Sequence, residues 1–193
     1  MVTDLLINQK SKIKYLGFVL GAAALLSGIV FSSLTYQRTK IWKDDITLWT
    51  NVLQQFPDGR MNFIYDKRAR QYIQKDQYDA ALADYQTMIA NDPRDDKALE
   101  SMGRIYGQHY RDLGKAVGVL EKAYSINPKN PAVLKSLGVA MGMKGNFQRS
   151  LDLLLQAYSI DKTDTSLVRN IAASYRYAGM NDKAIEFEKL VHH

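Results

Sequence analysis

Residue types that most often carry catalysis or bind metals are few and scattered in this chain of 193 residues. The chain has no cysteine, so the sequence offers neither a thiolate nucleophile nor a disulfide framework. Its three histidines are His109 and the pair His192 and His193, and no carboxylate cluster at metal-ligand spacing accompanies them. The sequence therefore predicts no metal site.

Two carboxylate pairs, Asp44–Asp45 and Asp95–Asp96, have the composition that general acid–base chemistry needs. Both pairs precede amphipathic stretches, where carboxylates favour the exposed amides of a helix start. No Gly-rich phosphate loop, nucleophile elbow or base-and-orienter pairing is present. We therefore expect no catalytic residue and no cofactor, and a chain that is not an enzyme by itself.

The elements that would position any site recur along the chain. The segments "QYDAALADYQTMIANDP", "DLGKAVGVLEKAYSINP", "NFQRSLDLLLQAYSIDK" and "MNDKAIEFEKLVHH" align on one small residue each. These anchors are Ala81, Ala116, Ser150 and Ala184, separated by 35, 34 and 34 positions. Such self-similarity at a fixed period indicates a repeat architecture.

A second pattern lies upstream of each anchor, where Leu137-Gly138 matches Met102-Gly103. Each unit is therefore expected to be two short helices, which must stack on neighbouring units because one hairpin cannot bury its apolar face. The turns between the two helices are predicted at Lys75-Asp76, around Arg111–Gly114, at Gly145-Asn146 and at Gly179-Met180.

The pattern resembles the tetratricopeptide repeat, which has a period of about 34 residues, small residues at helix contacts and a closing proline. The matching residues are Gly103, Gly138 and Ala172 in first helices, Tyr72, Tyr106 and Tyr175 at the aromatic position, Ala81, Ala116 and Ala184 in second helices, and the closing Pro93 and Pro128. Departures are Ser150 in place of alanine, Lys162 in place of proline, and one extra residue near His109. The resemblance implies an all-α, right-handed superhelical solenoid over residues 43–191.

The repeat domain is predicted over residues 61–193, as four units at 61–94, 95–129, 130–163 and 164–193. Residues 38–60 are interpreted as a half-repeat that caps the stack, because Pro57 falls where a closing proline belongs. Within this segment Trp49 takes the large aromatic position of a second helix.

An uncharged run from Tyr15 to Tyr36 is long enough, at about 1.5 Å per residue, to cross a bilayer core. Residues 15–37 are therefore predicted to be a single transmembrane helix, after a short basic tail at 1–14. A cleaved signal peptide is the competing interpretation, but its apolar core is shorter and needs a small-x-small cleavage site. The sequence favours a retained, single-pass anchor.

Details of the run extend this membrane hypothesis. Gly17, Gly21 and Gly28 form a small-residue face that would let another transmembrane helix approach, although such residues are also common in spans. Tyr15, Tyr36 and Trp42 are expected at the membrane interface. The lysine-bearing tail favours a bacterial inner-membrane location with the repeats on the periplasmic side, and contact with membrane lipid.

In tetratricopeptide solenoids the first helix of each unit lines a concave groove that usually binds an extended peptide. The candidate partner groove consists of Lys67, Arg70, Lys97, Arg104, Lys135, Arg169, Asn170 and Arg176. Its basic character favours an acidic peptide or a terminal carboxylate, unless these residues are ordinary solvated charges. The net charge of +6 is too mild for a nucleic-acid footprint, so no nucleic-acid partner is expected.

The segment Ala184–Val191 is predicted to expose an apolar edge, because no polar capping helix follows it. Such an edge would be open to a partner protein or to a second copy of the chain. Self-association through this helix is therefore a further hypothesis.

A second resemblance lies at residues 15–60, where a span, the stretch "TYQRTKIWKDDITLWTNVLQQFP" and repeats follow one another. This order is similar to the C-terminal part of membrane glycosyltransferases of the O-mannosyltransferase-like type, which use lipid-linked sugars. The catalytic loops of that family have no counterpart here. The leading functional hypothesis is a membrane-anchored protein-interaction scaffold. The alternatives are the repeat portion of such an enzyme and a polysaccharide reader.

Overall fold

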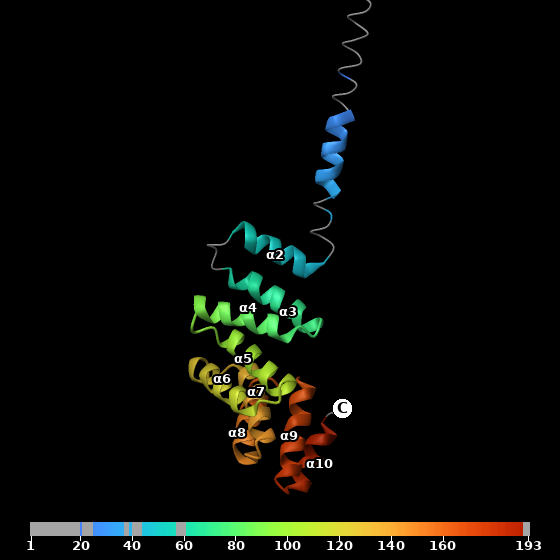
Figure 1. Ribbon diagram of the computed structural model, residues 1–193. Coiled ribbons are helices and arrows are strands. Elements are labelled where there is room, and N and C mark those ends of the chain that lie inside the picture. The colour runs from blue at the N-terminus through green and yellow to red at the C-terminus, as the bar shows by residue number, and fades with distance from the viewer. Residues whose placement is uncertain (1–19, 21–24, 37–38, 40–43, 57–60, 191–193) are drawn as a thin grey trace, which may run out of the picture. The chain divides into compact units, whose positions relative to one another are not determined.

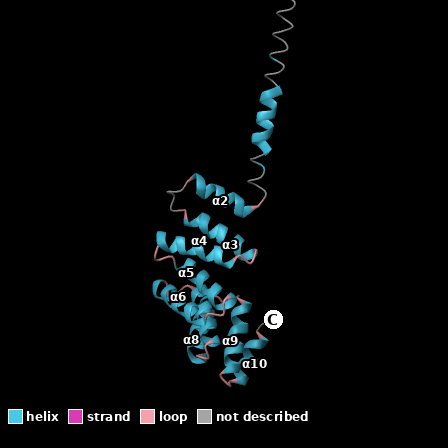
Figure 2. Ribbon diagram, viewed as in Figure 1, coloured by secondary structure: helices cyan, strands magenta, loops and turns pink. Residues whose placement is uncertain are grey.

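A computed structural model of the chain describes residues 20, 25–36, 39, 44–56 and 61–190. The described residues form helices and connecting loops without a strand (Figure 2). The chain divides into two compact units, Met1–Val52 and Leu53–His193. The larger unit carries the repeats, and the all-α prediction is confirmed for the described part of the chain.

Helices of the larger unit follow one another in chain order (Figure 1). They are α3 (Asn62–Gln74), α4 (Tyr78–Asn91), α5 (Asp96–Arg104), the π-helix η1 (Ile105–His109), α6 (Leu113–Ile126), α7 (Pro131–Met143), α8 (Phe147–Ile160), α9 (Thr165–Tyr177) and α10 (Asn181–Lys189). We call α3, α5, α7 and α9 the first helices, and α4, α6, α8 and α10 the second helices.

Each first helix packs against the second helix that follows it, and each pair packs against the next pair. The first helices also contact one another directly, α5 with α7 and α7 with α9. This nearest-neighbour stacking is the arrangement of a helical solenoid, as the repeat pattern predicts. The handedness of the superhelix and the boundaries of the units stay predictions.

The turns inside the pairs lie where the sequence predicts them. Asp76, Gly145 and Gly179 lie two positions after the end of a first helix, and Arg111 lies two positions after η1; each has a positive φ, between 56° and 83°. Glycine adopts this left-handed conformation without steric cost, whereas a residue with a Cβ is strained there. The same turn is therefore built with glycine in the last two units and without it in the first two.

Polar side chains cap the helices and join one unit to the next. The Asp95 carboxylate accepts from the backbone N–H of Ala98 at the start of α5, at 3.0 Å. Asp96 accepts from the side-chain amide of Asn130, the capping residue of α7, at 2.7 Å. The prediction that Asp95 and Asp96 serve a helix start is confirmed, and Asp96 also links consecutive first helices.

Small residues let the two helices of a pair approach closely. A Cβ built on Gly103 would lie 2.4 Å from Cγ of Leu120, and one on Gly138 would lie 2.8 Å from Cγ of Leu154. The four anchors of the repeat are all buried, and they are Ala81, Ala116, Ser150 and Ala184. Ser150 tolerates its buried position because its hydroxyl bonds that of Ser174 at 3.0 Å.

A buried ion pair joins the first pair of helices. Nε and Nη2 of Arg68 in α3 donate to the two carboxylate oxygens of Asp84 in α4, at 2.9 and 2.6 Å. Asp84 is only 3% exposed. The guanidinium donates a hydrogen bond to each carboxylate oxygen. These bonds offset the free-energy cost of burying the charge of Asp84 away from water.

The extra residue near His109 appears as the π-helix η1, which follows α5 without a break. A π-helix contains one residue more than the α-helical turn it replaces, which is how an insertion is absorbed without shifting the rest of the repeat. His109 stacks on Tyr78 with ring centroids 3.7 Å apart, and the Tyr110 hydroxyl donates to Asp79. The insertion is thereby held against α4.

Helix α2 (Asp45–Gln55) has no fully buried residue, and Trp49 is half-buried. Asp44 accepts from the backbone N–H of Ile46 at 2.9 Å, so Asp44 and Asp45 lie at a helix start as predicted. Pro57 and Trp42 lie outside the described residues. The interpretation of 38–60 as a capping half-repeat stays a prediction.

The predicted membrane location is wrong. Among the described residues, no helix is both long and apolar enough to cross a bilayer. The predicted span at 15–37 is therefore not observed, and the single-pass, periplasm-facing location is withdrawn.

Most residues assigned to that span lie outside the described residues, including Gly17, Gly21, Tyr15 and the flanking Trp42. Of the others, Gly28 would meet nothing within 4 Å if it carried a Cβ, and Tyr36 is exposed. Within the described residues, therefore, no helix packs on the Gly28 face.

Candidate functional site

Adjoining cavities lie along the first helices of the larger unit. One of about 460 Å³, the α7–α9 pocket, lies between α7, α9 and the start of α8. A second of about 310 Å³, the α5–α7 pocket, is lined by α5, η1, α7 and two residues of α9. The two share Val139, Met143 and Asn170, so they form one continuous depression, which we call the first-helix groove.

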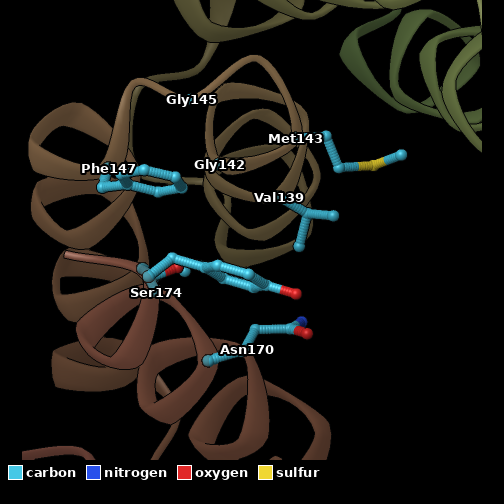
Figure 3. A pocket seen from close by; sticks show the side chains of 10 residues that line it. Val139, Gly142, Met143, Gly145, Phe147, Asn170 and Ser174 are labelled. Atoms are coloured by element: carbon cyan, nitrogen blue, oxygen red, sulfur yellow. The ribbon is translucent and has the colours of Figure 1, made fainter. Parts of the chain in front are cut away.

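The α7–α9 pocket is largely apolar. Val139 and Met143 of α7 form one wall, and Phe147 and Tyr177 form another, with their rings stacked at 5.7 Å. Figure 3 shows the Asn170 side chain directed to the same side of the helices as those of Val139 and Met143. Gly142 and Gly145 contribute backbone alone to the lining. A site of this kind suits an apolar group with one polar contact.

The α5–α7 pocket is polar by contrast. Its lining includes Arg104, Gln108, Lys135, Ser136 and Asn170, together with apolar atoms of α7. Neither of the two pockets is lined by a carboxylate of the described residues. The first-helix groove therefore combines an apolar end with a cationic end.

Three of the predicted groove residues, Arg104, Lys135 and Asn170, line the first-helix groove. Lys97 in α5 and Arg169 in α9 are exposed, and neither forms an ion pair within the described part of the chain. These five residues come from three successive first helices. Lys97 and Arg169 line neither pocket, and the predicted partner groove stays a prediction.

The remaining predicted cations are occupied by neighbours within the chain. Arg70 donates to Asp66 at 2.9 Å, and Arg176 donates to Glu188 of α10 at 2.5 Å. Lys67 lies 5.3 Å from the ring centroid of Phe63. These contacts reduce the number of positive charges that the solenoid presents to a partner.

Lys135 is also held internally, although it lines the groove. Its Nζ donates to Oδ2 of Asp164 at 2.6 Å and to Oγ of Ser166 at 3.3 Å. Asp164 caps α9 by accepting from the backbone N–H of Ser166 and Leu167. The hydrogen bond from Lys135, with those from Ser166 and Leu167, lowers the pKa of Asp164 from its ordinary value of 3.8 to about 2.

Replacing Lys135 by methionine should raise the pKa of Asp164 towards 3.8, because the largest cause of its depression is removed. Stability that depends on ionised Asp164 is complete above pH of about 4 and is lost as pH falls to about 2. The variant should therefore lose less stability over that window. NMR titration of the carboxyl group and denaturation at both ends of the window measure the two effects. Lys144→Met, at an exposed lysine, is the matched control; an unchanged pKa in Lys135→Met would contradict the prediction.

Behind the groove, Glu100 of α5 is only 8% exposed and accepts from the Ser136 hydroxyl of α7 at 2.6 Å. Nε of Arg104 lies 3.8 Å from the same carboxylate. The hydrogen bond between Ser136 and Glu100 joins α5 to α7, two consecutive first helices, next to the α5–α7 pocket. The ion pair between Arg104 and Glu100 is weak, because the Arg104 side chain is 47% exposed and the contact is long.

A third, smaller cavity of about 190 Å³ adjoins the second and is lined by Tyr78, Arg104, Gln108 and His109 among others. Within the described residues no group of three His, Cys, Asp or Glu side chains is placed to hold a metal ion. His192 and His193 lie outside the described residues. That the chain has no cofactor and is not an enzyme stays a prediction.

The apolar residues of the α7–α9 pocket are those that the sequence analysis missed. Val139 and Met143 are four positions apart on α7, and Asn170, Ala173 and Tyr177 follow at helical spacing on α9. This stripe lies beside the stripe of core residues on the same helices, so the periodicity of the sequence does not separate the two. The packing of the helices shows that this stripe faces the pocket and not the core.

Solved structures with similar architecture include tetratricopeptide-repeat proteins and MamA. A crystal structure of MamA matches with a TM-score of 0.64 and 17% identity, covering 76% of this chain and 84% of that chain. A thermophilic TPR protein of Thermus thermophilus matches with a TM-score of 0.63 and 21% identity, covering 83% and 88%. The chain has a tetratricopeptide-repeat fold.

A tetratricopeptide repeat protein from Parabacteroides merdae has a TM-score of 0.64 and 22% identity, over 83% of this chain and 61% of that one. No family model and no curated protein matches the chain. These comparisons establish the repeat fold and do not support the predicted resemblance to membrane glycosyltransferases.

The C-terminal edge differs in part from its prediction. Ala184 is buried, and Phe187 packs on Tyr158 and Tyr175. Ile185 and Leu190 are exposed, at 47% and 48%. Val191 lies outside the described residues. The apolar edge is therefore narrower than expected, because the anchor and the aromatic residue of α10 face the core.

Proposed function

We propose that this chain is a protein-interaction scaffold whose first-helix groove binds a segment of a partner protein. The observation that carries the proposal is the continuous groove along α5, η1, α7 and α9, which is lined by exposed side chains from successive repeats. Solenoids use such extended surfaces to bind chains rather than small molecules. The tetratricopeptide-repeat fold supports the same interpretation.

The partner segment is acidic in this proposal. Lys97 and Arg169 have no carboxylate partner among the described residues, and Arg104 is paired only loosely, at 3.8 Å from Glu100. Unpaired guanidinium groups bind carboxylates through forked hydrogen bonds. Nothing in the fold or the comparisons favours the glycosyltransferase alternative. The proposed partner is a protein segment and not membrane lipid.

Site-specific photo-cross-linking tests this function. A photoreactive phenylalanine replaces Gln108 or Met143, which line the groove, or Lys122 or Gln156, which are exposed on second helices. Irradiation in the native host should give adducts to the same partner protein from both groove positions. The second-helix positions should give none of that partner. Capture of the partner only from Lys122 or Gln156 would place the interaction elsewhere.

A further inference from the structure

We infer that the first-helix groove recognises a short extended motif with one large apolar side chain and a carboxylate two or three residues away. The apolar side chain enters the α7–α9 pocket, the carboxylate lies at Arg104 in the α5–α7 pocket, and Asn170 holds the main chain between them. This inference rests on the proposed function and specifies the partner's chemistry.

The apolar end is built to receive a side chain. Tyr177 is 75% exposed and Met143 is 42% exposed, although both are large and apolar in most of their surface. Tyr177 is held in place by stacking on Phe147 with the ring planes only 12° apart. A pocket of about 460 Å³ falls within the range of sites that enclose a ligand group, about 300–1,000 Å³.

Gly142 lets α7 lie close to the helices that follow it. A Cβ on Gly142 would lie 3.0 Å from Oγ of Ser150 and 3.7 Å from Oγ of Ser174, two buried hydroxyls that are hydrogen-bonded to each other. At Gly142 the pocket is therefore lined by helix backbone that packs against this hydroxyl pair. An apolar side chain that enters the pocket need not break the hydrogen bond between the two hydroxyls.

Asn170 supplies the polar contact. It lines both pockets, and its amide makes no hydrogen bond within the described part of the chain. A side-chain amide offers a donor and an acceptor side by side, which matches the N–H and C=O of an extended main chain. Because Asn170 lines both pockets, its amide would contact the peptide main chain between the apolar end and the cationic end of the groove.

The cationic end sets the charge of the partner. Arg104 and Lys135 line the α5–α7 pocket without a lining carboxylate among the described residues, and Lys135 is already bonded to Asp164. Arg104 is therefore the lining cation there that can take a new carboxylate. Alternate side chains of a β-extended peptide point to the same face about 6.6–7 Å apart, and every third side chain does so in a polyproline II conformation, about 9 Å apart. Adjoining pockets with three shared lining residues thus suit side chains separated by one or two residues.

A defined peptide array tests the inference with the full chain. The probes are ten-residue peptides of serine and glycine that carry one phenylalanine or leucine and one aspartate, in both orders, with one to five residues between them. Matched peptides replace the apolar residue by alanine or the aspartate by asparagine. Binding should require both residues and be strongest with one or two residues between them. Loss of either should weaken binding by about tenfold or more.

Variants of the chain locate the two ends. Ala173→Trp fills the α7–α9 pocket from an exposed position of α9, and Tyr177→Ser removes an exposed wall without touching the core. Both should weaken the best peptide by about tenfold or more, and Arg104→Gln should abolish the preference for aspartate over asparagine. Gln156→Trp, on the exposed face of α8, is the matched control and should bind as the unaltered chain does.

Equal binding of peptides without an apolar residue, or unchanged binding by both pocket variants, would overturn the inference. So would failure of every peptide in the array to bind. The proposed function is judged separately, because cross-linking at Gln108 and Met143 reports a partner of any sequence. Cross-linking without motif dependence would therefore leave the scaffold standing and remove only the motif.

Discussion

Replacing Arg68 by methionine should lower the free energy of unfolding by about 3–5 kcal/mol, because it leaves a buried carboxylate without its partner. Asp84 is 3% exposed and receives both of its strong hydrogen bonds from Arg68. Methionine keeps much of the aliphatic stem, so the change isolates the lost charge and hydrogen bonds. Urea denaturation followed by circular dichroism measures the effect.

Arg70→Met is the matched control, two positions further along α3. Arg70 also pairs with an aspartate, Asp66, but its side chain is 63% exposed. Surface pairs contribute about 0–1 kcal/mol, so this variant should be nearly as stable as the unaltered chain. Adding Asp84→Leu to Arg68→Met should recover most of the loss, since the unpaired charge is then gone. Equal effects of the two arginine variants would show that burial of Asp84 is not what matters.

The second large effect concerns Gly103 and Leu120, which pack α5 against α6. Leu120→Ala should cost about 2–5 kcal/mol, because Leu120 is only 1% exposed and its removal leaves a cavity. Gly103→Ala should cost about 1–3 kcal/mol, because its Cβ would lie 2.4 Å from Cγ of Leu120. The double variant should cost less than the sum by about 0.5–3 kcal/mol, since the new methyl group occupies part of the space left by leucine.

Gly118→Ala controls for helix propensity in the same pair of helices. A Cβ at Gly118 would meet nothing within 4 Å, so alanine there should stabilise the chain by up to about 1 kcal/mol. Opposite signs at Gly103 and Gly118 would demonstrate that close approach, and not backbone flexibility, selects glycine in α5. Additive costs in the Gly103–Leu120 cycle would contradict the proposed contact.

Features that depend on local sequence were predictable. The anchors from Ala81 to Ala184 recur at a fixed period, which indicates repeated pairs of helices. Each small residue leaves a gap on its helix, into which a side-chain ridge of the other helix packs. The turns were found from Gly145 and Gly179, which supply the left-handed conformation. Asp76 and Arg111 adopt that conformation without glycine, and only the repeat alignment located them.

Features that depend on side-chain partners were not predictable. Eight residues were assigned to the groove from their first-helix positions, yet Lys135 and Arg176 bond Asp164 and Glu188. Those carboxylates lie on elements packed alongside, and a linear sequence does not show which charges meet. The apolar wall at Tyr177 was missed because its stripe lies beside the core stripe of the same helix.

The membrane assignment failed for a different reason. Hydropathy over 15–36 measures how apolar a stretch is, and a continuous helix of sufficient length is a separate requirement. Residues 25–36 are helical and exposed, and among the described residues no helix is both long and apolar enough to cross a bilayer. The apolar composition of 15–36 was therefore not a sufficient ground for the membrane prediction.

Among the described residues, the side-chain links between repeats run from one unit to the next: Asn130 bonds Asp96, and Lys135 bonds Asp164. In a stack joined in this way, no single one of these links holds more than two repeats together. A tensile load along it is passed from junction to junction, and the weakest junction, rather than the summed strength of all of them, sets the force at which the stack begins to part.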